Sequence, residues 1–273
     1  MPGPKPLPLG LVIHQATPKD LFSLATLLAM VPDDGSLYRF PHILEHIDEM
    51  RDMHIGWLRP AIHEPTNLIR IAVVPTNNTE QVVGFTSWTH REIDPHDPSK
   101  TRLAKIAVEI PPAEETANSN AQSQTSNSRA LIPNKDRSDA IKRARKRSPP
   151  SPAANTPCYE LGGLAIHPDF QGQGIGSLLV RWGIDKAAEK HVPVFVTGET
   201  QGVEFYEQAI GFRRLPETEY WLDEAGRDIT REEVLNGNET WKKVNGGLSG
   251  SEMVWLPDGY VFEQCEDGVR STR

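Results

Sequence analysis

The stretch "LGGLAIHPDFQGQGIGSLLV", residues 161–180, decides the fold because a glycine-rich turn joins two apolar runs. The run that ends at Ile166 is typical of a strand, and the run that begins at Ile175 has the spacing of a helix with one apolar face. The first turn of a helix leaves backbone N–H groups free and carries a partial positive charge. Glycines before it let an anion approach closely, so "QGQGIG", residues 171–176, predicts a phosphate or pyrophosphate site.

Two familiar phosphate-binding patterns fit this turn poorly. The sequence has no G-x-x-x-x-G-K-[ST], so a P-loop is excluded. A Rossmann site would account for the order strand, turn, helix, strand, and for Glu199 after the second strand. However, Ser177 stands where the third Rossmann glycine belongs, and residues 167–171 separate the strand from the first glycine of the turn. A dinucleotide oxidoreductase is therefore the less favoured interpretation.

Hydrophobic periodicity predicts the elements around this turn and indicates an α/β domain. Strands are expected at 11–17, 68–75, 82–90, 159–166, 192–198, 212–222 and 251–257. Helices are expected at 17–28, 42–58, 174–191 and 201–210, the last of them closed by Gly211 in a left-handed conformation. Gly162 and Gly163, inside a predicted strand, suggest a bulge or a close backbone approach.

The composition is that of one globular domain with an insertion. The chain has 273 residues, 37% of them hydrophobic, and a net charge of -8. The strand pattern ends near Asp94, and residues 111–157 have few large apolar side chains and a local charge of +4. Burial in such a segment cannot offset its ordering entropy, so we expect a disordered insertion, of which residues 113–153 are dispensable for the fold and for turnover. The remainder carries -12, which disfavours nucleic-acid binding by the folded body and mildly favours a cationic substrate.

The sequence also indicates where the protein acts. It has no apolar run long enough to span a membrane and no secretory signal at its start, so we expect a cytoplasmic or nuclear protein. The basic run "KRARKR", Lys142 to Arg147, is a weak nuclear-import motif or a solvated charge run. Cys158 and Cys265 form neither a disulfide framework nor a zinc motif, so no metal site is expected, and Cys158 is expected in the core.

Three features together resemble the GNAT superfamily of N-acetyltransferases. Gln171, Gly174 and Gly176 match its Q/R-x-x-G-x-G/A signature, placed after a strand and at the start of a long helix. The stretch "FYEQAIGF", residues 205–212, resembles its short fourth helix, which ends in Y-x-x-x-G-F. The element order β, α, α, β, β, β, α, β, α, β, β is similar to its fold.

The resemblance implies a fungal-type member with a disordered insertion. Its domain would occupy residues 8–260, with the insertion at 111–157 inside it. The expected architecture is a GNAT-like mixed central sheet of about seven strands flanked by about four helices, with the long insertion before the strand that binds the coenzyme.

The resemblance implies a site for acetyl-coenzyme A as cosubstrate. The pyrophosphate would lie on the glycine turn, and the pantetheine arm would follow the preceding strand. The implied contacts are Leu164, Ala165, Ile166, Gln171, Gly172, Gln173, Gly174, Ile175, Gly176 and Ser177. The strand around Leu164 would also supply a backbone donor for the oxyanion that forms during acetyl transfer.

The resemblance also implies two catalytic side chains. Tyr206 matches the family tyrosine whose phenol lies near the coenzyme sulfur, where it would protonate the leaving thiolate. Glu160 stands four residues before Leu164, where a histone-acetyltransferase branch carries its glutamate, and would be the general base. A base helps because a lysine-like amine, with a pKa of about 10.4, is almost entirely charged at pH 7. The alternatives are that Tyr206 only fills the core and that Glu160 is a strand-edge acid in solvent.

The implied reaction is direct attack of a primary amine on acetyl-coenzyme A in a ternary complex. The acceptor could be a small molecule, a polyamine, a peptide amino terminus or a protein lysine, and His46 or Glu45 would line its groove. The oligomeric state is not indicated. An alternative from a different class is a non-catalytic acyl-coenzyme A sensor or scaffold with the same fold, which turnover of an amine panel would separate from an enzyme.

Overall fold

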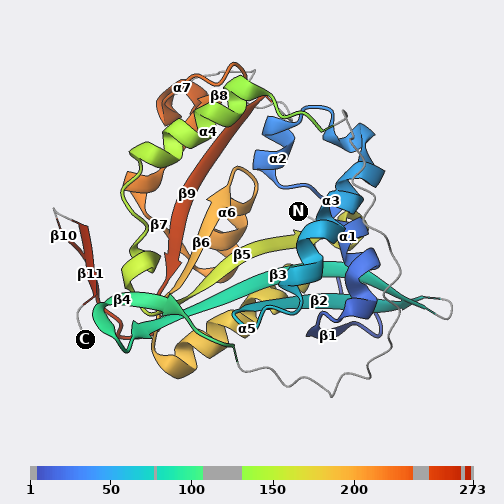
Figure 1. Ribbon diagram of the computed structural model, residues 1–273, viewed down its shortest axis with the longest axis horizontal. Coiled ribbons are helices and arrows are strands. Elements are labelled where there is room, and N and C mark those ends of the chain that lie inside the picture. The colour runs from blue at the N-terminus through green and yellow to red at the C-terminus, as the bar shows by residue number, and fades with distance from the viewer. Residues whose placement is uncertain (1–4, 77–78, 107–130, 236–245, 266–267, 272–273) are drawn as a thin grey trace.

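The computed structural model describes residues 5–76, 79–106, 131–235, 246–265 and 268–271. Within them, nine strands form one mixed sheet in the order β1-β2-β3-β5-β6-β9-β7, with β4 paired to β3 and β8 paired to β9 (Figure 1). These strands are β1 (Val12–Gln15), β2 (Asn67–Thr76), β3 (Thr79–Asp94), β4 (Asp97–Leu103), β5 (Cys158–Ile166), β6 (Val194–Glu199), β7 (Arg213–Arg214), β8 (Tyr220–Asp223) and β9 (Gly247–Trp255). The strands β10 (Phe262–Cys265) and β11 (Gly268–Ser271) form a separate pair.

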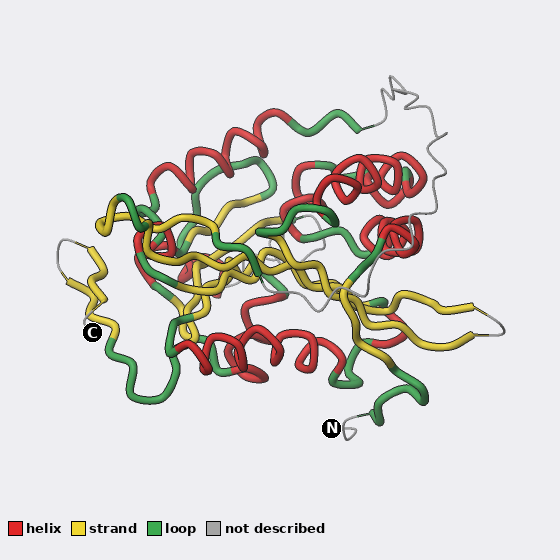
Figure 2. The backbone as a smooth tube through the Cα atoms, turned by 60° about the horizontal axis from the view of Figure 1, so that its bottom comes forward, coloured by secondary structure: helices red, strands yellow, loops and turns green. Residues whose placement is uncertain are grey.

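Helices cover both faces of this sheet, as Figure 2 shows. One face carries α5 (Ile175–Lys190), whose apolar side chains pack on β2, β3 and β5. The other carries α1 (Leu21–Met30), α2 (Asp34–Arg39), α3 (Ile47–Ala61) and α4 (Lys135–Arg147). The remaining helices are the short α6 (Gly202–Phe205) and α7 (Arg231–Leu235). Short 3-10 turns lie at Pro18–Asp20, Ile43–Glu45, Pro152–Asn155, Pro168–Phe170 and Pro216–Thr218. No helix in the described ranges has the length and apolarity needed to cross a membrane.

The predicted α/β class and mixed sheet are confirmed, but the sheet has two more strands than expected. The segment predicted as one strand at 212–222 forms β7 and β8, because Pro216 begins a 3-10 turn that interrupts the ladder. β4 pairs with the end of β3 although its residues, "DPSKTRL", are mostly polar. A polar strand at a sheet edge lacks the alternation from which strands are predicted.

β5 contains the predicted irregularity at Gly162. Ser87 of β3 pairs with Gly163 and Trp88 pairs with Leu161, so Gly162 is an extra residue that bulges from the ladder. On its other edge, β5 pairs in parallel with β6 only as far as Leu161, which lies opposite Val196. Beyond this point the two strands no longer pair, and we call this region, β5 residues 162–166 and β6 residues 197–199, the β5–β6 divergence.

The core beneath α5 depends on one close approach. Trp88 of β3 is fully buried, and Gly183 of α5 lies directly against its indole ring. A Cβ atom on Gly183 would lie 2.2 Å from the nearest ring carbon, so any side chain there requires the tryptophan or the helix to move. Glycine therefore stands inside this helix for packing, despite its low helix propensity.

The predicted disorder of residues 111–157 is wrong for the part that the structure describes. Residues 107–130 lie outside the described ranges, but Lys135–Arg147 form α4. The buried face of α4 consists of Arg137, Ala140, Ile141 and Ala144. Its apolar members pack on Tyr38, Tyr220, Leu222 and Leu248. The helical spacing is present in the sequence, but a stripe made mainly of alanine is inconspicuous among so many basic residues.

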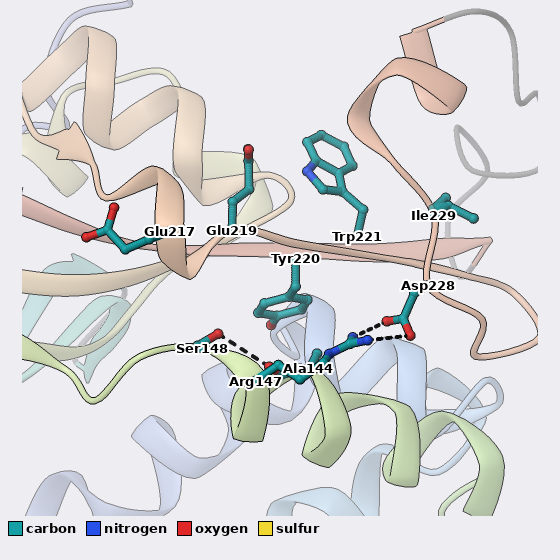
Figure 3. Close-up of a pocket in the computed structure, with 9 residues that line it drawn as sticks. All are labelled: Ala144, Arg147, Ser148, Glu217, Glu219, Tyr220, Trp221, Asp228 and Ile229. Atoms are coloured by element: carbon teal, nitrogen blue, oxygen red, sulfur yellow. Dashed lines mark hydrogen bonds and ion pairs between the residues drawn. The ribbon is translucent and has the colours of Figure 1, made fainter. Parts of the chain in front are cut away.

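Polar contacts fix both ends of α4. Asn134 caps the first turn by accepting the N–H of Arg137 at 3.1 Å, and the Arg137 side chain donates to the backbone carbonyl of Tyr38 at 3.0 Å. At the other end, Arg147 forms an ion pair with Asp228 beside a pocket of about 210 Å³ between α4 and β8 (Figure 3). The basic run therefore belongs to a helix that is docked on the sheet.

The segment after α6 differs from the family ending by one residue. Four residues, not three, separate Tyr206 from Gly211. The extra residue is accommodated by a π turn, Tyr206–Ile210, in which the Gly211 N–H donates to the carbonyl of Tyr206 at 3.0 Å. Gly211 then ends the helix in the predicted left-handed conformation, with a φ of 90°.

Candidate active site

The glycine turn begins α5 with a geometry that suits an anion. Gly172 and Gly174 have φ angles of 74° and 81°, which favour glycine. A Cβ atom on Gly172 would meet no atom within 4 Å, and one on Gly174 would meet only the Leu7 side chain, at 4.0 Å. The backbone of the turn is thus uncovered at the start of α5, where the first N–H groups of the helix lack helical partners. A phosphate that approaches these N–H groups closely needs this open space.

The two glutamines of the turn brace its backbone. The Gln171 Nε2 donates to the carbonyl of Ile166 at 3.1 Å, and the Gln173 Nε2 donates to the carbonyl of Asp169 at 3.0 Å. The first of these bonds ties the turn to the end of β5. Of the predicted contacts in α5, Ile175 is buried and Gly176 lies against the Phe205 ring, so these two residues offer a ligand their backbone.

The predicted strand contacts lie along the β5–β6 divergence. The side chains of Leu164 and Ile166 pack on the α5 face of the sheet, whereas Ala165 is buried on the α1 face. In the part of the chain that the structure describes, the backbone of residues 163–166 is paired with β3 alone. An extended ligand can therefore add to the other edge as another strand would.

Tyr206 lies in the core at the start of the π turn. Its side chain is buried, and its ring packs edge-on against Phe205 and Phe212. Burial, and to a smaller extent the charge of Glu199, raises the pKa of the Tyr206 phenol well above its usual range. The phenol therefore stays protonated at neutral pH, which is the form that can donate a proton.

Glu160 lies apart from Tyr206. It stands where β5 and β6 still pair, opposite Phe195, and its carboxylate forms an ion pair with Arg91 of β3. Strand alternation places Glu160 with Cys158 on the face opposite α5, whereas Tyr206 packs into the core on the α5 face. The structure therefore does not bring the two predicted catalytic side chains together on one face of the sheet.

Glu199, the last residue of β6, is an acidic residue to which the sequence interpretation gave no catalytic role. Its side chain is only 18% exposed, and it accepts a hydrogen bond of 2.7 Å from the backbone N–H of Gly35 in α2. The Arg145 guanidinium of α4 lies 3.9 Å away. Burial, followed by the charge of Asp33, raises the pKa of Glu199 to about 7. A carboxyl group with this pKa exchanges protons readily at neutral pH.

The sequence held one indication of this residue. Glu199 ends the buried strand "VFVTGE" at its carboxyl end, where ligand sites of α/β sheets gather. Its burial, however, depends on α2 and α4, which come from distant parts of the chain and one of which was predicted to be disordered. The strand sequence by itself therefore does not distinguish Glu199 from an exposed acid.

Other candidate residues have ordinary surroundings. Cys158 is fully buried, and burial raises the pKa of its thiol, so the predicted core role is confirmed. Glu45 pairs with His42 and His46 pairs with Glu49 near the start of α3. Their place in an acceptor groove stays a prediction.

A family comparison bears on the segment that carries this site. Residues 142–212 match the model of the Acetyltransferase (GNAT) family. The predicted GNAT resemblance is confirmed. The GNAT match begins within α4, contains the glycine turn and the β5–β6 divergence, and ends just after Tyr206 and Gly211. No curated protein matches the chain.

Several solved structures also resemble the chain. One is described as histone acetyltransferase HPA2 and related acetyltransferase from Corynebacterium glutamicum, with 15% identity, a TM-score of 0.46, and coverage of 91% of this chain and 97% of that one. Arabidopsis thaliana NAA60 with a bisubstrate analogue has 9% identity, a TM-score of 0.45, and coverage of 91% and 99%. PaiA N-acetyltransferase from Thermoplasma acidophilum with coenzyme A has 12% identity, a TM-score of 0.43, and coverage of 91% and 99%.

Proposed function

We propose that the protein is an acetyl-coenzyme A-dependent N-acetyltransferase, which transfers the acetyl group to a primary amine by direct attack in a ternary complex. The proposal rests on one arrangement within residues 142–212, the segment that matches the GNAT family model. The uncovered glycine turn at the start of α5 lies next to the edge of β5 that is unpaired among the described residues. The pyrophosphate of the coenzyme suits the turn, and its pantetheine arm suits the strand edge.

The residues along this path have distinct roles in the proposal. The coenzyme contacts are those predicted from 164–166 and 171–177, most of them through the backbone. A backbone N–H near Leu164 stabilises the oxyanion. The buried Tyr206 phenol protonates the thiolate that leaves, because its raised pKa keeps its proton available until a strong base forms beside it.

A dinucleotide oxidoreductase is not favoured. Doubly wound dinucleotide-binding sheets are mostly parallel, whereas β5 with β6 is the one parallel pair among the described strands of the large sheet. The non-catalytic sensor remains the second candidate by class. Turnover separates it from the enzyme, since a sensor binds the coenzyme without releasing its thiol.

The acceptor and the cellular location stay predictions. A small amine, a polyamine, a peptide amino terminus and a protein lysine are all compatible with the proposed chemistry. If Lys142–Arg147 is a nuclear-import signal, two of its side chains are already engaged inside the fold. Arg143 donates to the carbonyl of Gly226 and Arg147 pairs with Asp228, so an import receptor that reads these side chains has to compete with contacts inside the fold.

Binding of acetyl-coenzyme A to the full chain tests the proposal. At a hundredfold excess over its dissociation constant, the coenzyme should stabilise the fold by about 2.7 kcal/mol in thermal unfolding. Gly174→Val should abolish this shift. Gly259→Val is the matched control, because Gly259 has a similar φ of 74° and open space around it but lies in a turn after β9. Loss of the shift in both variants, or in neither, would exclude the glycine turn as the site.

A further inference from the structure

We propose that Glu199 takes the proton from the acceptor amine, an assignment that rests on the proposed acetyl transfer. The argument begins with strand register. Leu161 of β5 lies opposite Val196 of β6 in the last parallel pair. Leu164 and Glu199 each lie three residues further on, and the bulge at Gly162 uses one of those residues on β5. Glu199 is therefore within about one residue, or roughly 3 Å along the strand, of the level of Leu164.

The level of Leu164 is where the proposal places the reacting carbonyl. Glu160, in contrast, lies opposite Phe195, four residues before Glu199 and roughly 13 Å away along the strand direction. Its carboxylate is already engaged by the Arg91 guanidinium. Of the two carboxylates, Glu199 is thus the one at the level of the proposed chemistry, and its ion pair with the Arg145 guanidinium, at 3.9 Å, is longer than a hydrogen bond.

The side of the sheet on which Glu199 lies also suits an acceptor. Strand alternation places it on the face opposite α5, where α2 and α4 pack near the end of β6 (Figure 1). The coenzyme contacts begin at the glycine turn of α5, on the other face. An amine that approaches from the α2 side would therefore meet Glu199 before it meets the thioester.

The charged groups around Glu199 come from every element packed against it. Asp33 and Asp34 precede or begin α2, Arg145 comes from α4, Tyr220 comes from β8, and Tyr206 begins the π turn. The two aspartates raise the pKa of Glu199, whereas the Gly35 N–H and Arg145 lower it. Burial, the largest cause, acts in the same direction as the two aspartates, and together they outweigh the Gly35 N–H and Arg145 and leave the pKa at about 7. The carboxylate can therefore accept a proton near neutrality and release it to solvent in the next step.

The proton balance of the reaction is complete with these residues. An ammonium acceptor gives one proton to the Glu199 carboxylate, and the neutral nitrogen forms a bond to the thioester carbonyl carbon. The carbon–sulfur bond breaks, and the Tyr206 phenol gives its proton to the sulfur. The second proton of the nitrogen restores the phenol as the amide forms. The products are the amide, coenzyme A thiol and one proton, which Glu199 passes to water.

Steady-state kinetics of the full chain with acetyl-coenzyme A tests this assignment. A panel containing a polyamine, a small aliphatic amine, and peptides with a free amino terminus or an internal lysine identifies the best acceptor by thiol release. With that acceptor, kcat/KM is measured from pH 5.5 to 9.5 for the parent, Glu199→Gln, Glu160→Gln and Glu204→Gln. Glu204 is the matched control, since it is an exposed glutamate five residues further along the chain.

The expected result is specific to a proton acceptor. The parent should show a rise in kcat/KM through about pH 7. Glu199→Gln should lose about 100- to 10,000-fold at pH 7, should lack this inflection, and should recover in part at high pH, where more of the amine is already neutral. Its glutamine can still accept the Gly35 N–H, so a merely structural role predicts an unchanged pH profile. Glu204→Gln should behave as the parent.

Three outcomes would overturn the assignment. A parent-like pH profile in Glu199→Gln removes Glu199 from proton transfer. Loss of the inflection in Glu160→Gln, with Glu199→Gln unaffected, transfers the role to Glu160. Absence of thiol release by the parent with every amine, despite acetyl-coenzyme A binding in thermal unfolding, removes the proposed transferase function and the role of Glu199 with it.

Discussion

The carboxylate of Glu199 accepts a hydrogen bond from the backbone N–H of Gly35, which precedes it by 164 residues. A second hydrogen bond runs beside it in the opposite direction, from the Gln201 N–H to the Asp34 carboxylate, at 2.9 Å. The start of α2 is thus joined to the end of β6 at two adjacent positions. The position of α2 therefore contributes to the burial of Glu199 and orients its carboxylate.

Gly35→Ala should disturb this relationship without changing any titratable group. A Cβ atom at residue 35 would lie 2.8 Å from the Glu199 Oε1, so the carboxylate or α2 has to shift. Because a displacement of about 1 Å can cost roughly a hundredfold in rate, we expect kcat/KM to fall by at least about tenfold. Acetyl-coenzyme A binding, measured by thermal unfolding, should be retained. Gly56→Ala on α3, where a Cβ atom meets nothing within 4 Å, is the control, and equal rates in both variants would contradict the prediction.

The stability of the protein should depend on pH through Glu199. Its pKa is about 7 in the folded state and about 4.5 in the unfolded chain, so the folded state binds the proton more tightly. The stabilisation is therefore complete below pH 4.5 and is lost as the pH rises to about 7, by about 3 kcal/mol. Urea unfolding from pH 4.5 to 8 should show a smaller fall in the free energy of unfolding for Glu199→Gln than for Glu204→Gln. Parallel curves for the two variants would contradict the folded-state pKa.

Gly183→Ala should destabilise the core more than its size suggests. The added Cβ atom lies 2.2 Å from the fully buried Trp88 ring, and overpacking of this kind costs about 1–3 kcal/mol or more. The same change at Gly56 fills open space on a helix and should be neutral or stabilising by up to about 1 kcal/mol. The free energies of unfolding of both variants check this. Similar values would mean that α5 can move away from Trp88 at little cost.

Ala144→Asp should show that α4 is part of the fold. Ala144 is buried against the sheet, so an aspartate there places an unpaired charge in an apolar cluster. We expect a loss of about 2–4 kcal/mol in the free energy of unfolding. Ala154→Asp introduces the same charge at an exposed alanine and should change stability by less than about 0.5 kcal/mol. Equal stability of the two variants would support the expectation that this part of the chain is dispensable for the fold.

The part of the fold predicted from the sequence is the part that local chemistry determines. The strand, glycine turn and helix at 161–180 depend on residues close together in the chain, and the bulge at Gly162 follows from paired glycines in a strand. α4 and β4 were missed because each is stabilised by distant partners, such as Tyr38 for α4 and the end of β3 for β4. Neither carries a hydrophobic pattern strong enough to reveal those partners.

The candidate site also has a part that could be predicted from the sequence and a part that could not. The glycine turn and Tyr206 could be assigned from motifs, whereas the surroundings of Glu199 could not. Its pKa depends on its burial and on the charge of Asp33, and its carboxylate accepts a hydrogen bond from Gly35. Asp33 and Gly35 both precede Glu199 by more than 150 residues. Side-chain type and spacing predict which groups are available, but desolvation depends on the complete fold.

The bulge at Gly162 changes the phase of β5. In a regular strand, residues three apart face opposite sides, yet Leu161 and Leu164 both pack on the α5 side, because Gly162 adds one residue between them. Deleting Gly162 would remove the bulge without reversing the strand, because Leu161 and Leu164 would then lie two positions apart and still face α5. Residues 163–166 would keep their faces and their partners on β3, but β5 would lose the local bend and extra twist that a bulge introduces, so the extra residue sets the direction of the strand beyond Leu161.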